Sequence, residues 1–489
     1  MNDPLLIGID VGTTAVKAAV FDLSGRALKS YASRYPTDRA RDGHVTQNPQ
    51  DWVQRCLQAL AELTEGVANG AAAAVGLTSQ ANTHVFVDGT GSPLLPAFVW
   101  QDGRCAGEAA QIDAQVATGD RLAWWGAPLP IDASHVLARM AFVARRHPEI
   151  WRQTRWVMAP KDYCIFRLTG VVAADPLTAF GVVDGSLAYI PQLIALVPGA
   201  AERLPPLLGP LAPAGCIGKG LPGAGVPMVN GTMDAWAGLI GAGVARQDEA
   251  GYLSGTSEVL GIVSRRKTPT PGVIAFPACE GIVLHAGPTQ AGGASIEWLS
   301  GLLGRSHTEL SALVENTAVS VPVPLFLPHL AGERAPLWDI TSRASFAGMS
   351  SATGPADLTR AVMEGVGYSA RLLLESLEHS ADSRPEFLRI AGGCTQSDAW
   401  CQIRADILGR PLRRSAYRDV GTLGAAMLAG VGSGLISSID EATRLLAHAD
   451  RVFEPRASEG DRHAFGFGKY QELYRQLTEF NAGFCRFYA

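Results

Sequence analysis

Apolar residues near the start of the chain fall in short runs that are separated by turns. The runs Leu5–Asp10 and Lys17–Phe21 predict two buried strands, and a third strand is expected near Ala27–Tyr35. A further apolar run, Ala74–Thr78, predicts another buried strand. The pattern indicates that the chain begins with a β-sheet.

Helical periodicity follows this first sheet. Residues 48–64 carry one apolar stripe, with Asn48 as the expected N-cap and Pro49 at the first helical position. Residues 105–170 predict mainly helix. Residues 198–226 are rich in proline and glycine and predict an irregular connection.

Three further helices are predicted later in the chain. The segments Ala235–Ala245 and Gly421–Val431 consist largely of small residues, which lower intrinsic helix stability and need close backbone packing as compensation. They suit either two helices that cross at a hinge between domains or tight packing inside a core. The stripe within Phe465–Phe487 predicts a helix that faces a core.

The first hairpin recurs in weaker form half a chain later. Residues Gly8–Val20 correspond to Gly251–Val263, and both copies have an apolar strand, a turn of glycine and hydroxyl residues, and a second apolar strand. Such a turn suits phosphate binding by backbone N–H groups, although single glycine hairpins are common. The repeat predicts two related domains, residues 1–246 and 247–489, that grip a nucleotide between them, with the charged segment Arg246–Glu249 at their boundary.

The composition is that of a globular protein with a large core. Of 489 residues, 47% are apolar and 18% are charged, and a net charge of −5 without a long basic run gives no reason to expect nucleic acid or a membrane as a partner. No segment resembles a membrane helix or a signal peptide. The eight cysteines form no Cys-x-x-Cys pair, so no zinc site or disulfide framework is indicated, and a reducing cytoplasm is the expected location.

Two aspartates directly follow strand-like segments. Asp10 precedes the first turn, where a carboxylate beside phosphate is favourable if a divalent cation lies between them; alternatively, it caps its own turn. The second copy has Leu253 at this place, so a metal role would belong to the first domain alone. Asp234 precedes an Ala/Gly helix, where it could act as general base toward an acceptor hydroxyl, as the helix N-cap, or as both.

Polar and aromatic side chains gather in two loops, Ser79–His84 and Val99–Arg104. This mixture suits a polyol, because amides and carboxylates pair its hydroxyls and an aromatic ring covers its C–H face. Gln80, Asn82 and Trp100 are the candidate substrate residues. The chain has no Gly-x-x-x-x-Gly-Lys-Ser/Thr motif, which argues against a P-loop fold, and no Gly-x-Ser-x-Gly or His-Glu-x-x-His motif.

Several short segments, each weakly specific alone, follow one another in a distinctive order. They are Ile9–Thr14, Val99–Asp102, Ala159–Tyr163, Leu168–Gly170, Gly231–Gly238, Ser254–Ser257, Ala291–Leu299, Leu327–Pro336, Ala391–Gly393 and Leu423–Ala426. In this set the chain resembles the FGGY family of carbohydrate kinases over essentially its whole length. The resemblance implies an α/β, two-domain fold of the actin/Hsp70/sugar-kinase (ribonuclease H-like) type with a deep interdomain cleft.

The resemblance also implies a role for each matching residue. Asp234 would be the catalytic base and Asp10 the carboxylate on the metal side, with ATP and Mg²⁺ as cofactors. The other implied nucleotide-binding residues are Thr13 and Thr14 near the transferred phosphate, Gly255 and Thr256 near the polyphosphate, and Gly293, Glu297, Gly393 and Ser397 around adenine and ribose.

The implied activity is ATP-dependent phosphorylation of a hydroxyl of a small sugar, and Leu327–Pro336 favours the ketopentose, xylulokinase-like branch. The acceptor positions depart from two branches. Glycerol kinases carry Arg-Glu where this chain has Ala81-Asn82, and xylulose kinases usually carry Gln-Met-His over residues 80–82. A kinase for glycerol, erythritol or ribulose, a nucleotide-driven conformational protein of the same fold and a sugar-binding regulator stay as alternatives. A homodimer is a candidate assembly.

Overall fold

A computed structural model describes residues 4–40, 43–65, 72–316 and 322–488. The chain forms two compact units, and neither is continuous in sequence. Unit 1 comprises residues 1–245, 276–281 and 419–447, and unit 2 comprises residues 246–275, 282–418 and 448–489. Over the described residues, no helix combines the length and apolarity that crossing a membrane requires.

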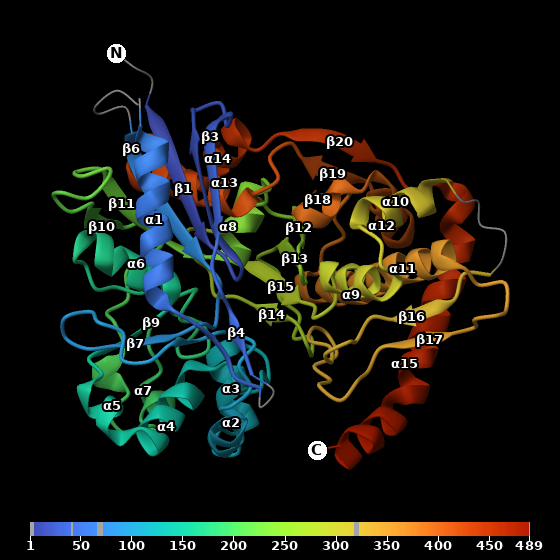
Figure 1. The fold of residues 1–489 in the computed structure, drawn as a ribbon, viewed down its shortest axis with the longest axis horizontal. Helices are drawn as coiled ribbons and strands as arrows, with labels where there is room; N and C mark the ends of the chain where they lie inside the picture. The colour runs from blue at the N-terminus through green and yellow to red at the C-terminus, as the bar shows by residue number, and fades with distance from the viewer. Residues whose placement is uncertain (1–3, 41–42, 66–71, 317–321, 489) are drawn as a thin grey trace. The chain divides into compact units, whose positions relative to one another are not determined.

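Unit 1 is built on a mixed sheet (Figure 1). In spatial order its strands are β10 (Pro213–Cys216), β11 (Pro227–Met233), β6 (Ala72–Ser79), β1 (Leu5–Val11), β2 (Ala15–Phe21) and β3 (Ala27–Arg34). β1 pairs antiparallel with β2 and parallel with β6, which in turn pairs parallel with β11. The predicted strands are therefore confirmed, and the carboxyl ends of the parallel strands β1, β6 and β11 meet at one edge of the sheet.

Unit 2 contains a second mixed sheet of the same design. Its strands are, in spatial order, β14 (Ile274–Ala275), β15 (Leu284–Pro288), β13 (Glu258–Val263), β12 (Ala250–Ser254), β18 (Leu388–Ala391), β19 (Leu412–Ser415) and β20 (Ala449–Phe453). The hairpin β12–β13 is flanked by the parallel strand β18, as β1–β2 is flanked by β6. The repeat in the sequence is thus a repeat of structure.

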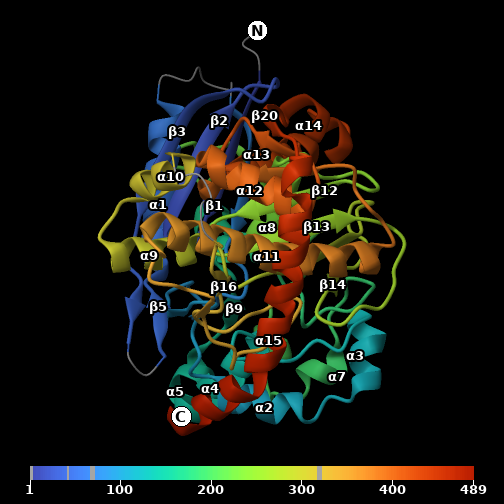
Figure 2. The same ribbon diagram turned by 90° about the vertical axis from the view of Figure 1, so that its right-hand side faces the viewer.

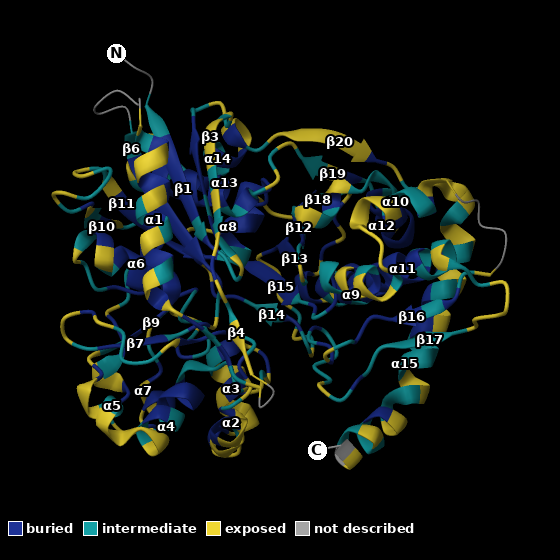
Figure 3. Ribbon diagram, in the orientation of Figure 1, coloured by how far each residue is buried: buried dark blue, intermediate teal, exposed yellow. Residues whose placement is uncertain are grey.

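Helix α1 (Pro49–Thr64) begins where the sequence predicts. The side chain of Asn48 accepts a hydrogen bond from the backbone N–H of Gln50 at 3.2 Å and so satisfies one free donor of the first turn. The stripe that includes Trp52, Cys56 and Leu60 is buried in the apolar core that also contains residues of β1 and β2. Figure 3 shows the exposed residues along the opposite side of the helix.

The two small-residue helices, α8 (Asp234–Gly241) and α13 (Val420–Gly432), both belong to unit 1. A Cβ atom at Gly424 would lie 1.7 Å from the carbonyl oxygen of Ala237, so the two helices touch through their backbones. α13 also packs on the sheet, where a Cβ atom at Gly8 would lie 1.8 Å from the carbonyl oxygen of Thr422. Tight packing within one unit therefore accounts for the small residues.

The other elements of unit 1 are short. Its further strands are β4 (Asp38–Arg39), β5 (Val45–Gln47), β7 (Val85–Val87), β8 (Ala97–Phe98) and β9 (Trp156–Met158). Its further helices are α2 (Ala106–Asp113), α3 (Thr118–Trp125), α4 (Val136–Arg146), α5 (Pro148–Gln153), α6 (Pro160–Thr169), α7 (Pro191–Ile194), η1 (Ala201–Arg203) and α14 (Ile439–Leu446). The helical content predicted between residues 105 and 170 is confirmed.

In unit 2, helices cover the sheet. They are α9 (Gly293–Leu303), α10 (His307–Asn316), α11 (Pro355–Ala381), η2 (Gly393–Gln396), α12 (Asp398–Leu408), η3 (Ala457–Glu459) and α15 (Gly460–Tyr488), together with the strands β16 (Leu325–Leu327) and β17 (Ser345–Ala347). The predicted terminal helix α15 runs across α11 (Figure 2). Of its stripe Tyr470 is buried, but Phe480 is 64% exposed, so the helix faces the core over part of its length only.

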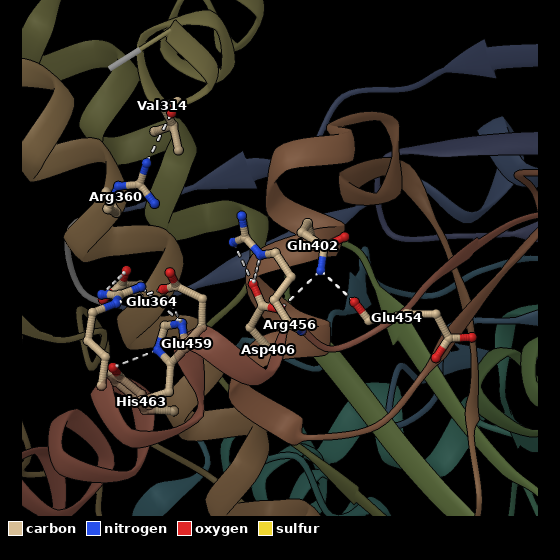
Figure 4. A network of polar contacts seen from close by, with 11 residues as sticks. Val314, Arg360, Glu364, Gln402, Asp406, Glu454, Arg456, Glu459 and His463 are labelled. Carbon is tan, nitrogen blue, oxygen red and sulfur yellow. Dashed lines mark hydrogen bonds and ion pairs between the residues drawn. The ribbon is translucent and has the colours of Figure 1, made fainter. Parts of the chain in front are cut away.

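Ion pairs fix the start of α15 on unit 2. Arg462 donates to the buried carboxylate of Glu364 on α11 at 2.9 Å, and Arg456 binds the buried carboxylate of Asp406 on α12 at 2.6 Å (Figure 4). His463, beside Arg462, bonds to the hydroxyl of Tyr368 at 3.1 Å. These contacts are structural and lie within unit 2.

Candidate active site

Three predicted site residues lie at the carboxyl ends of neighbouring parallel strands in unit 1. In the sheet register Asp10 pairs with Thr78, and Ser79 pairs with both Val11 and Met233. Gln80 and Asp234 directly follow the paired residues Ser79 and Met233. The fold therefore brings Asp10, Gln80 and Asp234 to one edge of the sheet.

One oxygen of the Asp10 carboxylate, Oδ1, is buried without a hydrogen-bond partner among the described residues. Burial and the nearby charge of Asp234 raise the pKa of Asp10 from 3.8 to about 7, against the opposing effect of Lys17. A carboxylate in this state is suited to a cation.

The cationic group near Asp10 is already paired with another carboxylate. The Nζ atom of Lys17 on β2 lies 2.5 Å from Oδ1 of Asp419, which precedes α13. The return of the chain into unit 1 through α13 therefore adds a second carboxylate near Asp10. A Cβ atom at Gly421 would lie 2.7 Å from Oδ2 of Asp10, so the backbone of α13 approaches this carboxylate closely.

The turn between β1 and β2 holds Thr13, which is half-buried, and Thr14, which is exposed. The N–H of Gly12 donates to the carbonyl oxygen of Ala15 at 3.1 Å and closes the turn. The indole N–H of Trp100 donates to Oγ1 of Thr13 at 3.1 Å. A residue predicted for the sugar and a residue predicted for the phosphate are thus in direct contact.

Asp234 is the first residue of α8, and Met233 occupies the N-cap position. The alternative that Asp234 is the N-cap is therefore wrong. Its Oδ1 atom accepts a hydrogen bond from the N–H of Ala235 at 2.8 Å. A carboxylate in the first helical turn interacts favourably with the helix dipole, and an ionised carboxylate at this position can accept a proton from a bound hydroxyl.

The predicted acceptor loop is held by a buried arginine that the sequence does not reveal. Asn82 is exposed and has a φ of 51°, and its carbonyl oxygen accepts a hydrogen bond from Arg139 on α4 at 2.5 Å. Arg139 also donates to the carbonyl oxygens of Phe98 and Val99 at 2.9 and 2.6 Å. His84, whose pKa is lowered well below 6.5 by burial and by Arg139, stays neutral in this loop.

A second missed group supports the strand that leads to Asp234. The buried ammonium of Lys161 on α6 lies 2.5 Å from Asp162 and 3.1 Å from Asp175. Asp175 accepts from the hydroxyl of Thr232 on β11 at 2.8 Å. The sequence places Lys161 in a recognisable motif but gives no sign of its partner Asp175, because the pairing depends on tertiary contacts.

In unit 2, the turn between β12 and β13 contacts the start of α9. The N–H of Gly293 donates to the carbonyl oxygen of Gly255 at 2.8 Å, and the N–H of Ala294 donates to that of Thr256 at 3.0 Å. A Cβ atom at Gly293 would lie 2.7 Å from Sγ of Cys394, so this position requires glycine. The structure therefore brings Gly255, Thr256 and Gly293 together.

Of the other residues predicted for the nucleotide, Gly393 lies beside this turn, because the thiol of its neighbour Cys394 donates to the carbonyl oxygen of Gly255 at 3.4 Å. Gly393 begins η2 and has no atom within 4 Å of an added Cβ, which leaves open space beside it. The hydroxyl of Ser397 caps α12 and bonds to Ser311 at 2.7 Å. Glu297 is 75% exposed on α9 and pairs with His307 at 2.8 Å.

A buried ion pair that the sequence does not predict stabilises the second turn. Glu258 accepts hydrogen bonds from Arg404 on α12 at 2.6 Å and from the hydroxyl of Ser254 at 2.8 Å. Arg404 is buried against the ring of Trp400 at 3.9 Å. These partners are about 150 residues apart in sequence, so no local pattern could reveal them.

Comparisons with known proteins agree with this arrangement. Residues 5–241 match the N-terminal domain, and residues 250–433 the C-terminal domain, of the FGGY family of carbohydrate kinases. A xylulose kinase of Escherichia coli is 30% identical over 89% of this chain and 92% of its own, and one of Bacillus subtilis is 28% identical over 99% of both chains. A ligand-bound xylulose kinase of Lactobacillus acidophilus has a TM-score of 0.89, with 23% identity over 98% of this chain and the whole of its own, which shows the shared fold.

Proposed function

We propose that the protein phosphorylates a hydroxyl of a ketopentose, with Asp234 as the general base. The chain belongs to the FGGY family of carbohydrate kinases and is thus an ATP-dependent sugar kinase. One observation carries the assignment of the base: Asp234 directly follows β11, next to Gln80 and Asp10 at the same edge of the sheet. A base must reach the proton of the acceptor hydroxyl, and this edge presents its carboxylate beside the residues assigned to sugar and phosphate.

We assign Asp10 to the metal side of ATP. The buried Oδ1 atom lacks a partner, and the raised pKa marks a carboxylate that would gain from a neighbouring cation. Mg²⁺ usually takes one or two protein carboxylates together with water and phosphate oxygens, so a site at Asp10 needs few protein ligands. When bound, Mg²⁺ would neutralise charge on the phosphates.

The other contributions to catalysis come from residues of the protein itself. Phosphoryl transfer has a loose transition state, so catalysis depends on positioning and on dispersing charge. The N–H groups of Thr13 and Thr14 would bind the transferred phosphate, and those around Gly255 would bind the polyphosphate. Gln80, Asn82 and Trp100 would orient the sugar so that its hydroxyl lies in line with the phosphate.

Xylulose is the favoured ketopentose, because the two relatives compared above, 28% and 30% identical over most of the chain, are xylulose kinases; a glycerol kinase is 29% identical over 94% of the chain, so glycerol needs a direct test. Asn82 leaves the acceptor loop different from the Gln-Met-His pattern that xylulose kinases usually carry, so related ketopentoses are included in the proposal. Coupled ADP release measured over ketopentoses, aldoses and polyols tests it. The highest kcat/KM for an aldose or for glycerol would contradict the assignment.

The role of Asp234 has its own test. Asp234→Asn keeps the shape and removes only the interaction of the charge with the helix dipole, so stability should change by less than about 1 kcal/mol. Sugar and nucleotide binding should persist in calorimetry, whereas kcat should fall by ~10²–10⁴-fold. Asp184→Asn, at an exposed turn of the same unit, serves as the control. Normal turnover by the Asp234 variant would place the base elsewhere.

A nucleotide-driven conformational protein of the same fold makes a different prediction. Such a protein hydrolyses ATP without a sugar, whereas a sugar kinase needs the acceptor. Dependence of ADP release on added ketopentose therefore separates the two functions, and a high rate without sugar would refute the kinase assignment.

A further inference from the structure

The turn between β1 and β2 is held by hydrogen bonds to three consecutive carbonyl oxygens of the turn. The hydroxyl of Tyr35 donates to the carbonyl oxygen of Gly12, and the backbone N–H of Tyr35 donates to that of Thr14 at 3.4 Å. Between them, the carbonyl oxygen of Thr13 accepts from Nε2 of Gln47 at 2.7 Å. Tyr35 and Gln47, which lie outside every motif that the sequence analysis singled out, therefore fix the orientation of these peptide groups.

This arrangement leaves the opposite side of the turn available. Among the described residues, the backbone N–H groups of Thr13 and Thr14 make no hydrogen bond. When carbonyl oxygens are tied back on one side, the adjacent N–H groups point to the other. That is the geometry by which a backbone turn binds an anion.

The amide of Gln47 can take one orientation only. The carbonyl oxygen of Thr13 can only accept, so it requires the NH₂ group, and the indole N–H of Trp52 can only donate, so it requires the amide oxygen, which it meets at 3.2 Å. Nε2 of Gln80 donates to the same oxygen at 2.9 Å. Gln47 is 1% exposed, so solvent does not compete for these bonds.

We propose that Gln47 and Tyr35 are positioning residues that orient the phosphate turn for phosphoryl transfer, and that Gln47 links this turn to the acceptor residue Gln80. The proposal rests on the proposed function, in which Thr13 and Thr14 bind the transferred phosphate. Neither residue touches the reactants. They act by holding the peptide groups of the turn, and a small displacement of such groups weakens a site built on orientation.

Gln47→Glu separates positioning from packing. The carboxylate keeps both acceptor bonds, from Trp52 and Gln80, and it can accept from the hydroxyl of Thr37, to which Nε2 of Gln47 donates at 2.8 Å. It cannot donate to the carbonyl oxygen of Thr13. Burial raises the pKa of such a carboxyl group, and its protonated form can donate again. Among the described residues, the hydrogen-bond partners of the Gln47 side chain are Thr13, Thr37, Trp52 and Gln80, none of which titrates near neutrality.

The experiment compares kcat, the two KM values and the melting temperature of the wild type with those of Gln47→Glu, Gln47→Met and Tyr35→Phe between about pH 6 and about pH 9. Loss of one oriented hydrogen bond predicts a fall in kcat of roughly 5- to 100-fold for Gln47→Glu at the alkaline end, with the sugar KM changed less. The ratio of its kcat to that of the wild type should rise as the pH falls. For Gln47→Met, which cannot donate at any pH, this ratio should stay flat.

Tyr31→Phe is the matched control for Tyr35→Phe, because the hydroxyl of Tyr31 bonds to Gln58 on the surface at 3.0 Å. Tyr35→Phe should lower kcat and Tyr31→Phe should not. A kcat near the wild-type value for Gln47→Glu and Tyr35→Phe, or a loss for Gln47→Glu that does not depend on pH, would overturn the proposal. Failure of the proposed function is distinguishable, because Asp234→Asn would then turn over normally.

Discussion

The carboxylate of Asp10, whose Oδ1 atom is buried without a hydrogen bond to the described residues, should lower the stability of the folded protein. Its pKa is raised from 3.8 to about 7, and each unit of such a shift corresponds to about 1.4 kcal/mol. The full shift would amount to about 4 kcal/mol at alkaline pH. Because Asp10 is half-buried and local relaxation offsets part of the burial, we expect about 1–2 kcal/mol. Asp10→Asn removes the charge and keeps the shape, so it should raise stability by that amount.

The sign of the pH dependence follows from proton binding. Between about pH 4 and about pH 7 the unfolded chain has released the proton of Asp10 while the folded protein retains it, so the stability of the wild type falls as the pH rises through this window. The stabilisation by Asp10→Asn should therefore grow from pH 5 to pH 7 and level off above. The opposite case is Asp88, where hydrogen bonds from Thr90 and Ser92 lower the pKa. Asp88→Asn should not stabilise the protein at any of these pH values.

Thermal unfolding of the wild type and both variants at several values between about pH 5 and about pH 8 measures these effects. Magnesium with ADP should raise the melting temperature of the wild type more than that of Asp10→Asn, because the variant lacks the carboxylate assigned to the metal. If Asp10→Asn is no more stable than the wild type at about pH 8, or gains equally at every pH, the reasoning about this site is wrong.

Three further tests, two of them with a matched control variant, address other parts of the molecule. Asn82→Ala should raise the sugar KM about 5- to 150-fold with the ATP KM unchanged. Asn82→Gly, which suits a φ of 51°, separates loss of the amide from backbone strain. An equal loss of ATP affinity would show that the loop is structural. Gly255→Val should raise the ATP KM several-fold in a folded protein, because the nearest atom to an added Cβ is 3.5 Å away; an unchanged KM would remove this turn from the nucleotide site. Gly424→Ala would place its Cβ atom 1.7 Å from a carbonyl oxygen and should lower the free energy of unfolding by about 3 kcal/mol or more. Gly301→Ala on α9, with open space around it, should be neutral or stabilising. Similar melting temperatures for the two variants would contradict the close packing of α8 and α13.

The sequence predicts what depends on local pattern. Short apolar runs predict β1, β2, β3 and β6, and the recurrence of Gly8–Val20 half a chain later predicts the second hairpin. The cap at Asn48 and the start of α1 also follow from local chemistry. Asp10 and Asp234 could be chosen as candidates because each directly follows a strand.

What the sequence misses depends on contacts between distant residues. Gln47 and Tyr35 look like ordinary positions of a strand and a loop, and their role appears only when the turn at Thr13 is seen beside them. Arg139 lies on an amphipathic helix whose pattern does not reveal the three backbone carbonyls that it holds. The location of α13 in unit 1 is likewise hidden, because a repeat of two halves suggests that each half keeps its own segments.

The discontinuous path of the chain has a consequence for synthesis on the ribosome. Strands β1 and β6 are complete once Ser79 has been made, but α13, which packs on both, comes only after Asp419. During most of translation the apolar surface that α13 will cover has no native partner, and exposed surface of this kind favours aggregation. The nascent chain should therefore depend on chaperones until late in its synthesis. A fragment that ends at residue 245 should be poorly soluble, although it contains Asp10 and Asp234.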